Sequence, residues 1–545
     1  MMTFRAITSI AVLACLAPTL GMADAVPPAA IALGLCAAHV FEEVRPVVAP
    51  ASAILSGYGT GGFPIRAANA RAQAFFDNGM QLGHAFAHKS AIAAFKAAEL
   101  ADPTCAMCAW GEAWARGPTI NYPIDAKTQT ELAALADKAA ALAKDGPDKE
   151  RRLTSALQAR YRDGGGKGPG DRAFAAQMDA LARDHPQDNE LAITAADAWM
   201  IPAAHVGNKD HLNRALELLG GALTRNPDDT GAIHFYIHAT EMDGLPARAE
   251  AYADRLQRLA PAASHLVHMP SHTYYWVGRY ADAARANVEA VRIDDANAPR
   301  GGVWKLDYHG HNVSFGIGAA MIAGDGEEAL GLAGPAIAAA DPKTASTVIG
   351  HAYAAEGRYA GRAQVAALPD PGADKPYLQA MWRYARGESA ARAGDIAAVR
   401  TEAAAITALP TKTFTGHQAA VVQVAQRVLQ GRAAMLDHRP GDAANAYREA
   451  ASLQEAQFGG YRDPPLWWYP VRRSLAAALL QAGQAEAART EAHAALKTWA
   501  DDPLTLQVLA RAERTLGEGS AAAKDEAVSR RGWAGDPTAE VLARI

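Results

Sequence analysis

Aromatic residues, charge and cysteine are all scarce in this chain of 545 residues. Only 7% of the residues are aromatic and 20% are charged, while 50% are hydrophobic. Short side chains therefore dominate, and they suit closely packed helices better than sheets. The 53 basic residues are fewer than the 58 acidic ones and form no block that could neutralise a row of phosphates. A nucleic-acid partner is consequently not expected.

Long apolar runs are also missing. No segment offers about 18 uninterrupted apolar residues, so we expect no transmembrane segment. A shorter run, Ala6–Leu20, follows Arg5 and precedes the small residues of 23–25. These are the parts of a signal peptide, which predicts that 1–25 is removed and that the protein is periplasmic or secreted. A lipoprotein cut before Cys15 is the alternative interpretation.

Three of the four cysteines, Cys36, Cys105 and Cys108, would remain in the mature chain. The spacing of Cys105 and Cys108 allows a local disulfide, a redox pair or half of a metal site. No second CxxC completes a zinc ribbon, and Ala109 stands where covalent haem attachment needs a histidine. A purely structural pair is therefore favoured, and the state of Cys36 stays open.

The spacing of large, small and helix-ending residues follows the 34-residue tetratricopeptide (TPR) pattern. Six positions match in the first repeat: Phe75, Gly79, Ala91, Phe95, Ala98 and Pro103. The pattern returns around Gly278, around Gly431 and more loosely around Gly483. Small residues let paired helices approach closely, and the aromatic ring fills the gap between them. We therefore expect an all-α fold, a TPR-like α-solenoid of antiparallel helix pairs.

Segments rich in glycine or proline interrupt the predicted array. They lie at Arg162–Arg172, Asn297–Trp304, Leu368–Pro376 and Gly459–Pro465. The expected organisation is a signal peptide at 1–25, an N-terminal extension at 26–66, helical repeats with the first histidines at 67–296, further repeats with His309 and His311 at 297–367, and C-terminal repeats at 368–545.

Histidine is concentrated in one part of the chain, where seven of the 17 residues of this type fall between positions 234 and 311. His234, His238 and Glu241 stand at i, i+4 and i+7 of a helix that we expect to be capped near Asp228–Asp229, so they share one face. A later helix, which we expect Ser264 to cap, repeats the arrangement with His265, His268 and His272. Both helices are predicted to present a polar stripe.

One repeat separates the two stripes. His234 and His268 are 34 residues apart, and so are His238 and His272. They occupy positions five and nine of the first helix of each repeat, which face the concave groove in this kind of solenoid. Neighbouring first helices lie about 8–10 Å apart. Four imidazoles are therefore expected to converge on one volume, with Glu241 at its edge.

Converging neutral imidazoles and a carboxylate are suitable ligands for zinc, copper or iron. We therefore expect a transition metal ion, and its candidate ligands are His234, His238, Glu241, His268, His272 and His311. His265 and His309 are candidates to line the groove around a small-molecule or peptide ligand. No GxSxG, HExxH or dinucleotide-binding motif is present. If the protein is an enzyme, the expected class is a metal-dependent oxidoreductase or hydrolase, with Glu241 as a metal ligand or catalytic base.

Pro270 leaves two interpretations of the second stripe open. If one helix runs from His265 to Val277, the proline lies inside it and predicts a kink, because it clashes with the carbonyl group of Leu266. If the helix instead begins at Pro270, the residue is well suited to its position.

Two further groups of residues are candidates. Trp467, Tyr469 and Arg472 offer flat apolar surface beside a fixed charge, which suits an aromatic or carboxylate-bearing ligand, although a packed core with capping charges is favoured. His84 begins a third HxxxH pair, but it lies 150 residues before His234, which is not a multiple of 34. It is not required in the site.

The histidine segments resemble those of bacterial TPR proteins that carry "HxYIHxxE" followed by "HLVHMPxHxY". The likeness extends over 68–483, and the segments that carry it are 234–241, 265–274, 102–113, 311–312 and 463–472. It implies a secreted or periplasmic helical-repeat fold and supplies no established reaction. Ser314 departs from the pattern, because relatives tend to have a second histidine there.

Two functions are therefore open. In one, the groove binds a transition metal ion. In the other, the protein is a non-catalytic scaffold that binds a peptide or protein partner, as most TPR proteins do. The usual clamp for a peptide carboxylate has Lys, Arg or Asn at positions five and nine, whereas this chain has histidine.

Overall fold

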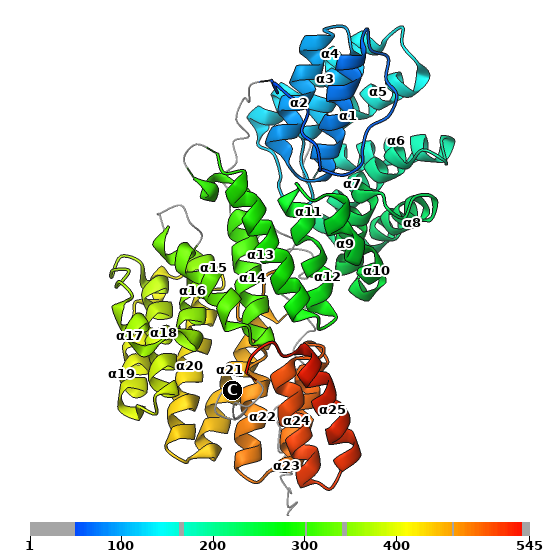
Figure 1. Ribbon diagram of the computed structural model, residues 1–545. Helices are drawn as coiled ribbons and strands as arrows, with labels where there is room; N and C mark the ends of the chain where they lie inside the picture. Colours follow the sequence, from blue (N-terminus) through cyan, green and yellow to red (C-terminus); the bar gives the residue numbers. More distant parts are fainter. Residues whose placement is uncertain (1–49, 163–167, 300–301, 340–345, 460–462, 537–545) are drawn as a thin grey trace, which may run out of the picture.

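The computed structural model describes residues 50–162, 168–299, 302–339, 346–459 and 463–536. Its regular elements are helices, and consecutive helices pack against one another along a curved path from α1 to α25 (Figure 1). The expected all-α, TPR-like solenoid is therefore confirmed. The predicted signal peptide, Cys15 and Cys36 lie outside the described residues. None of the helices in these ranges is long and apolar enough to cross a bilayer.

The N-terminal helices are α1 (Ala70–His84), α2 (His88–Ala101), α3 (Ala106–Ala115), α4 (Ala126–Ala143), α5 (Asp148–Arg162), α6 (Pro169–Asp184), α7 (Asn189–Val206) and α8 (Lys209–Arg225). The middle of the chain contains α9 (Thr230–Met242), η3 (Pro246–Ala249), α10 (Glu250–Leu259), α11 (Ser264–His268), α12 (Pro270–Trp276), α13 (Tyr280–Ala296), η4 (Val303–Lys305) and α14 (His309–Ala323).

The C-terminal half continues with α15 (Gly326–Ala338), α16 (Ser346–Tyr359), α17 (Arg362–Ala367), α18 (Pro376–Arg392), α19 (Ile396–Thr407), η5 (Thr411–Thr413), α20 (Gln418–Leu436), α21 (Pro440–Phe458), α22 (Arg472–Gln481), α23 (Ala485–Leu496), α24 (Pro503–Thr515) and α25 (Gly519–Gly532). The predicted interruptions separate helices. The first interruption, predicted at Arg162–Arg172, is shorter than expected because α6 already begins at Pro169. The fixed φ of proline suits the first turn of a helix.

Glycines and aromatic rings pack the helices together as the repeat pattern predicts. The Phe95 ring of α2 lies so close to α1 and α3 that a Cβ atom on Gly79 or Gly111 would come within 2.6 or 2.2 Å of it. Tyr447 fills the same kind of gap beside Gly431, where an added Cβ would lie 2.4 Å from the ring. The absence of a side chain at these glycines is therefore a packing requirement.

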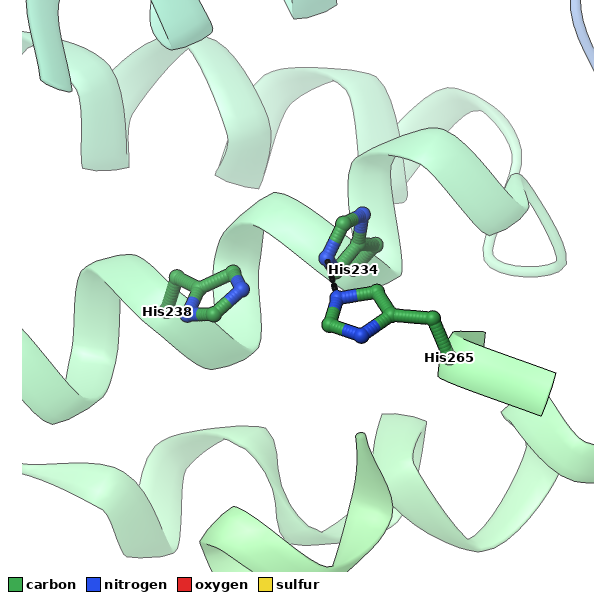
Figure 2. A group of neighbouring side chains, drawn as sticks. All are labelled: His234, His238 and His265. Atoms are coloured by element: carbon green, nitrogen blue, oxygen red, sulfur yellow. Dashed lines mark hydrogen bonds between the residues drawn. The ribbon is translucent and has the colours of Figure 1, made fainter. Parts of the chain in front are cut away.

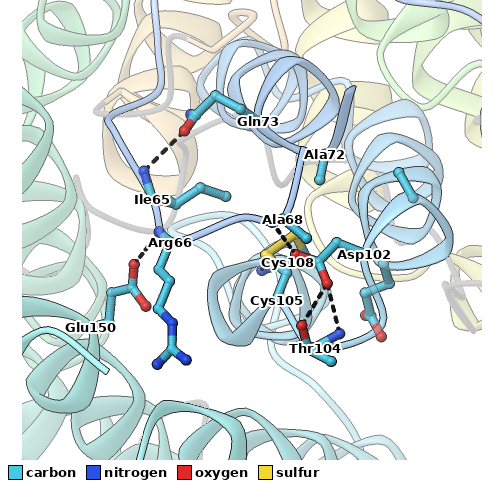
Figure 3. Close-up of a disulfide and its surroundings, with 12 residues drawn as sticks. Ile65, Arg66, Ala68, Ala72, Gln73, Asp102, Thr104, Cys105, Cys108 and Glu150 are labelled. Atoms are coloured by element: carbon cyan, nitrogen blue, oxygen red, sulfur yellow. Dashed lines mark hydrogen bonds between the residues drawn. A yellow bond between two sulfur atoms is a disulfide. The ribbon is translucent and has the colours of Figure 1, made fainter. Parts of the chain in front are cut away.

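The segment before α1 is tied to the N-terminal helices without forming a helix itself. The Arg66 amide donates to the Glu150 carboxylate at 2.6 Å, and the Ala68 amide donates to Asp102 at 2.6 Å (Figure 3). Beside this contact, Cys105 and Cys108 form a buried disulfide at the start of α3. Of the three possibilities for this pair, the structure has the local disulfide.

The solenoid bends until its C-terminal helices reach the middle of the chain. In Figure 1, α22–α25 lie beside the ends of α12–α14. The Tyr280 hydroxyl donates to the Ala500 carbonyl at 2.8 Å, and the Ala534 amide donates to the Ala323 carbonyl at 2.8 Å. Residues far apart in the sequence can therefore meet at the histidine-bearing helices.

A pair of glycine variants tests the packing account. Gly111→Ala is expected to lower the free energy of unfolding by about 1–3 kcal/mol, because its methyl group would overlap the Phe95 ring. Gly331→Ala is the control, because Gly331 is an exposed residue of α15 and its added Cβ has no neighbour within 4 Å. This substitution should stabilise the helix by up to about 1 kcal/mol. Thermal unfolding followed by circular dichroism measures both, and equal shifts would contradict the account.

Candidate metal centre

Two short helices, separated by a single residue, carry the second histidine stripe. Helix α11 ends at His268, and α12 begins with Pro270 in its first turn. The outcome lies between the two interpretations of Pro270: helical residues precede it and Met269 keeps helical dihedral angles, but the regular helix is interrupted and α12 starts at the proline, where a residue without an N–H is tolerated. The expected Ser264 cap is wrong by one position, since Ala263 precedes the helix and makes no side-chain cap. Asp229 does cap α9, accepting from the Ala232 amide at 3.2 Å.

Three imidazoles and a carboxylate converge in a group that we call the Asp463 cluster, which consists of His268, His272, His311 and Asp463. His268 Nε2 lies 2.9 Å from His272 Nε2 and 3.1 Å from His311 Nε2. Asp463 Oδ1 lies 3.3 Å from His311 Nε2 and 3.6 Å from His272 Nε2. All three rings are fully buried.

Contacts on the far side of two rings determine which nitrogen faces the cluster. Asn287 donates its amide to the Ala283 carbonyl at 2.8 Å, so its Oδ1 accepts from His268 Nδ1 at 2.6 Å. Glu241 Oε2 accepts from His272 Nδ1 at 3.0 Å. With Nδ1 protonated in both rings, each Nε2 offers a lone pair toward the centre, which is the usual arrangement of metal-binding histidines.

Two lone pairs at a separation of 2.9 Å repel each other unless a cation lies between them. A proton on His272 supplies this charge. Burial alone would lower the pKa of His272, but the carboxylates of Asp463 and Glu241 outweigh it and raise that pKa to about 9. Burial holds the pKa of His268 well below its ordinary value, so its ring is neutral. The cluster therefore stabilises positive charge at its centre.

Four of the six distances among the four converging atoms of the Asp463 cluster are close to those between the ligand atoms of a tetrahedral ion. With metal–nitrogen bonds of about 2.0–2.1 Å, the ligand atoms of a tetrahedral zinc site lie about 3.3 Å apart. The four distances recorded in the Asp463 cluster run from 2.9 to 3.6 Å. A neutral His268 ring of fixed tautomer, the Nε2 atoms of His272 and His311 and a buried carboxylate thus provide the kinds of donor that such an ion requires, and the His272 proton would be released on binding.

A second group, the His triad, lies next to the first and consists of His234, His238 and His265 (Figure 2). His234 Nε2 is 3.1 Å from His265 Nε2, and one nitrogen from each ring lies within 4.8 Å of the others. The two groups adjoin, since the ring centres of His238 and His272 are 5.7 Å apart. Burial lowers the pKa of His234 to about 3, so this ring is neutral at physiological pH.

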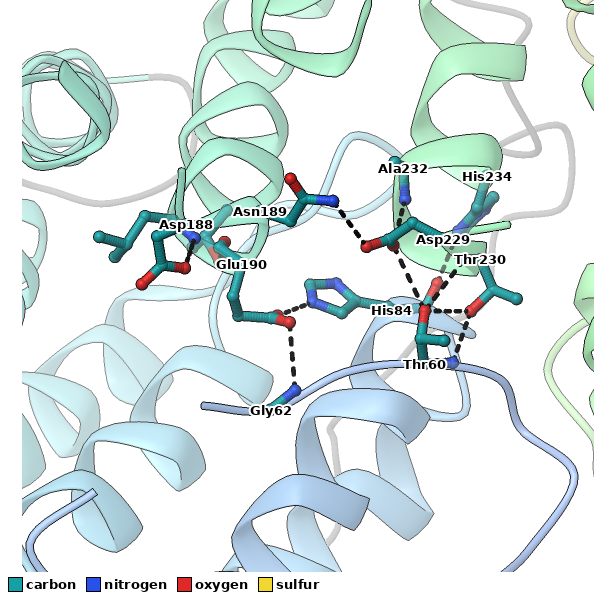
Figure 4. Close-up of polar contacts among 12 residues, drawn as sticks. Thr60, Gly62, His84, Asp188, Asn189, Glu190, Asp229, Thr230, Ala232 and His234 are labelled. Atoms are coloured by element: carbon teal, nitrogen blue, oxygen red, sulfur yellow. Dashed lines mark hydrogen bonds and ion pairs between the residues drawn. The ribbon is translucent and has the colours of Figure 1, made fainter. Parts of the chain in front are cut away.

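His84 contributes to the triad through its backbone. Its carbonyl accepts from His234 Nδ1 at 2.6 Å, and its ring contacts the buried Glu190 carboxylate (Figure 4). Glu190 also accepts from the Gly62 amide at 3.1 Å. The 34-residue spacing gave no reason to include His84, because the contact depends on how α1 lies against α9 and not on the period.

Asp463 is the cluster member that the sequence did not suggest as a ligand. The segment after it is tied to the histidine helices through His351, whose Nε2 donates to the Leu466 carbonyl at 3.4 Å and whose Nδ1 accepts from the Ser314 hydroxyl at 2.6 Å. Ser314 therefore supports the segment that carries Asp463. In the sequence, Asp463 was placed only in a predicted interruption, Gly459–Pro465, and in one segment of the family resemblance.

The remaining candidates lie outside both groups. Glu241 contacts Nδ1 of His272, and its other oxygen accepts from Trp276 Nε1 at 2.9 Å. His309 lies against Asp294, 3.2 Å away. Tyr469 is fully buried beneath Arg473. Arg472 forms ion pairs with Glu455 and Glu491, and Trp467 lines a separate cavity of about 380 Å³ together with Arg472.

Comparison with known proteins finds only distant structural likeness. No protein-family model and no curated protein matches the chain. A human IFIT1 dimer with PPP-AAAA is 14% identical, with a TM-score of 0.28 over 82% of this chain and 86% of that chain. A human IFIT1 dimer with m7Gppp-AAAA, also 14% identical, has a TM-score of 0.30 over 86% and 91%. Naa15/Naa10 bound to HypK-THB is 13% identical, with a TM-score of 0.25 over 85% and 70%. Scores this low carry no ligand or partner over to this chain.

The buried carboxylate of Asp197, on α7 behind His84, predicts a pH-dependent stability. Burial raises the pKa of Asp197 to about 6, even though Arg160 and His84 oppose the shift. The folded state must therefore give up a tightly held proton, and this carboxylate should destabilise it increasingly as the pH rises from about 4 to 6.

Asp197→Asn should remove this dependence. We expect the variant to exceed the wild type in free energy of unfolding by up to about 3 kcal/mol at neutral pH, and the difference to shrink toward zero near pH 4. Urea unfolding at several pH values measures it. A difference that stays constant with pH would show that Asp197 does not titrate in this range.

Proposed function

We propose that this protein is a metal-binding α-solenoid in which His268, His272, His311 and Asp463 hold a divalent transition metal ion. The observation that carries the proposal is the convergence of three buried Nε2 atoms and one carboxylate oxygen at 2.9–3.6 Å. When bound, such an ion supplies Lewis-acid chemistry or fixes the ligand-bearing segments to one another. We also propose that the protein is exported to the periplasm, as expected from the N-terminal signal peptide.

The four proposed ligands come from separate elements of the chain. His268 and His272 come from the two short helices α11 and α12, and His311 comes from the first turn of α14. Asp463 joins them from the irregular segment between α21 and α22. Holding one ion would therefore connect the middle of the solenoid to its returning C-terminal part. Glu241 and Asn287 act as positioning residues, because each fixes the tautomer of one ligand ring.

Burial favours metal binding over a peptide clamp at these histidines. His234, His238, His268 and His272 are each 0% exposed, so a peptide in a solvent-filled groove would not reach them. A second function, binding of a small molecule or a peptide, is supported by a different feature: the cavity beside Trp467, whose other walls include Arg472 and Lys497. Glu455 pairs with Arg472 in the same wall, so Lys497 beside the aromatic ring is the cation that suits a carboxylate-bearing ligand.

Metal analysis of full-length protein purified without a histidine tag tests the primary function. After chelation and reloading with zinc, the wild type should retain about one ion in the Asp463 cluster, and His311→Ala should lose it. His493→Ala, which removes an exposed histidine on α23, should behave as the wild type. At zinc concentrations of about 100 times Kd, binding should stabilise the wild type by about 2.7 kcal/mol. Zinc retained by His311→Ala to the wild-type level would refute the assignment.

The positioning residues generate a separate expectation. Glu241→Gln and Asn287→Leu should each weaken zinc binding by about 10- to 100-fold while leaving the stoichiometry unchanged. Trp276→Phe is the matched control, because it removes a contact to Glu241 but leaves the contact between Glu241 and His272. Competition with a chromophoric chelator measures the affinities. Unaltered affinity in both variants would mean that the tautomers are not set by these contacts.

A further inference from the structure

The His triad differs from the Asp463 cluster in its chemistry. Its three rings are buried, with exposed fractions of 0% for His234 and His238 and 4% for His265. Among the residues that the structure describes, no carboxylate makes a hydrogen bond or an ion pair with these rings. Any cation held here would therefore be surrounded by neutral donors only.

Several ring nitrogens of the triad have no hydrogen-bond partner in the described part of the chain. They are both nitrogens of His238 and Nδ1 of His265. Leaving a buried polar atom unpaired costs about 1–3 kcal/mol. Each neutral imidazole has one nitrogen with a lone pair, so His238 and His265 each keep a lone pair that no hydrogen bond in this part of the chain uses, and one nitrogen of each triad ring lies within 4.8 Å of the others.

The third ring is oriented by the backbone. His234 donates its Nδ1 proton to the His84 carbonyl at 2.6 Å, so its Nε2 carries the lone pair that points toward His265. The carbonyl comes from the end of α1, which also anchors the ring of His84 on Glu190. The triad therefore has one donor of fixed tautomer, His234 Nε2, to which His265 Nε2 donates at 3.1 Å. A cation held between these two rings would take the place of this proton, and the tautomer of His238 is set by no contact in the described part of the chain.

Phe86 closes this group with an apolar wall. Its ring stacks on His265 with centres 5.1 Å apart and meets the edge of His234 at 4.5 Å. To do so it adopts a φ of 54°, in the left-handed region that bulky residues rarely occupy. Backbone strain of this kind is typical of functional sites. Tyr308 also lies against His265, with ring centres 4.3 Å apart, and its ring centre is 6.2 Å from that of Phe86.

From these features we infer that His234, His238 and His265 form a second metal site, which takes monovalent copper. Imidazole is a good ligand for copper, and monovalent copper is stable with three donors, whereas zinc in proteins is usually held by four ligands. The cost of burying an ion rises with the square of its charge, so a site of neutral donors with aromatic walls favours a monovalent ion over a divalent one. The Asp463 cluster, which includes a carboxylate, favours a divalent ion instead.

The test uses the full chain, stripped of metal, loaded with one equivalent of zinc and titrated with Cu(I) without oxygen against the chelator bicinchoninate. We expect the wild type to bind about one copper and one zinc ion. His238→Gln and His265→Gln should lose copper and keep zinc, whereas His311→Ala should lose zinc and keep copper. Loss of copper binding and loss of zinc binding can therefore be observed separately.

Three outcomes would overturn the inference: no copper bound by the wild type, copper lost in His311→Ala but not in His238→Gln, or, in a parallel titration with two equivalents of zinc, a second zinc ion that Cu(I) does not displace. Copper K-edge absorption of the wild type gives a reading that does not depend on how the variants fold. Three imidazole nitrogens around copper support the assignment, and any other ligand set contradicts it.

Discussion

Buried imidazole nitrogens that face one another are the constraint on which this structure depends. His268 and His272 meet through Nε2 atoms 2.9 Å apart, and the contacts to Asn287 and Glu241 leave a lone pair on each. Such a pair is stable in a protein interior only with a cation between the rings. A proton on His272 meets this requirement, and a metal ion held by the proposed site would take its place.

The course of the solenoid explains why the fourth ligand comes from so far away. Asp463 lies 152 residues after His311 in the sequence and reaches it because the C-terminal helices fold back onto α12–α14. His351 links this segment to α14 through Ser314. A metal ion at the cluster would act on the same connection, so its binding and the closure of the solenoid are parts of one equilibrium.

The fold could be predicted from the sequence to a large extent, because helix pairs place the same residue types at a fixed period. Gly79 and Phe95 were identified from that period alone, and they pack as expected. The site could be predicted only in part. The 34-residue spacing brought His238 and His272 to the same region, but the two rings belong to different groups, and even His265 and His268 of the same short helix are divided between these groups. Asp463 and His84 could not be predicted, since their contacts arise from tertiary closure, on which a local period carries no information.

X-ray diffraction from zinc-loaded crystals, recorded on both sides of the zinc absorption edge, tests the central claim most directly. The account predicts an anomalous peak about 2.0–2.2 Å from Nε2 of His268, His272 and His311 and from a carboxylate oxygen of Asp463. A peak bound by other residues, or none in a protein whose histidine rings lie as described, would contradict it.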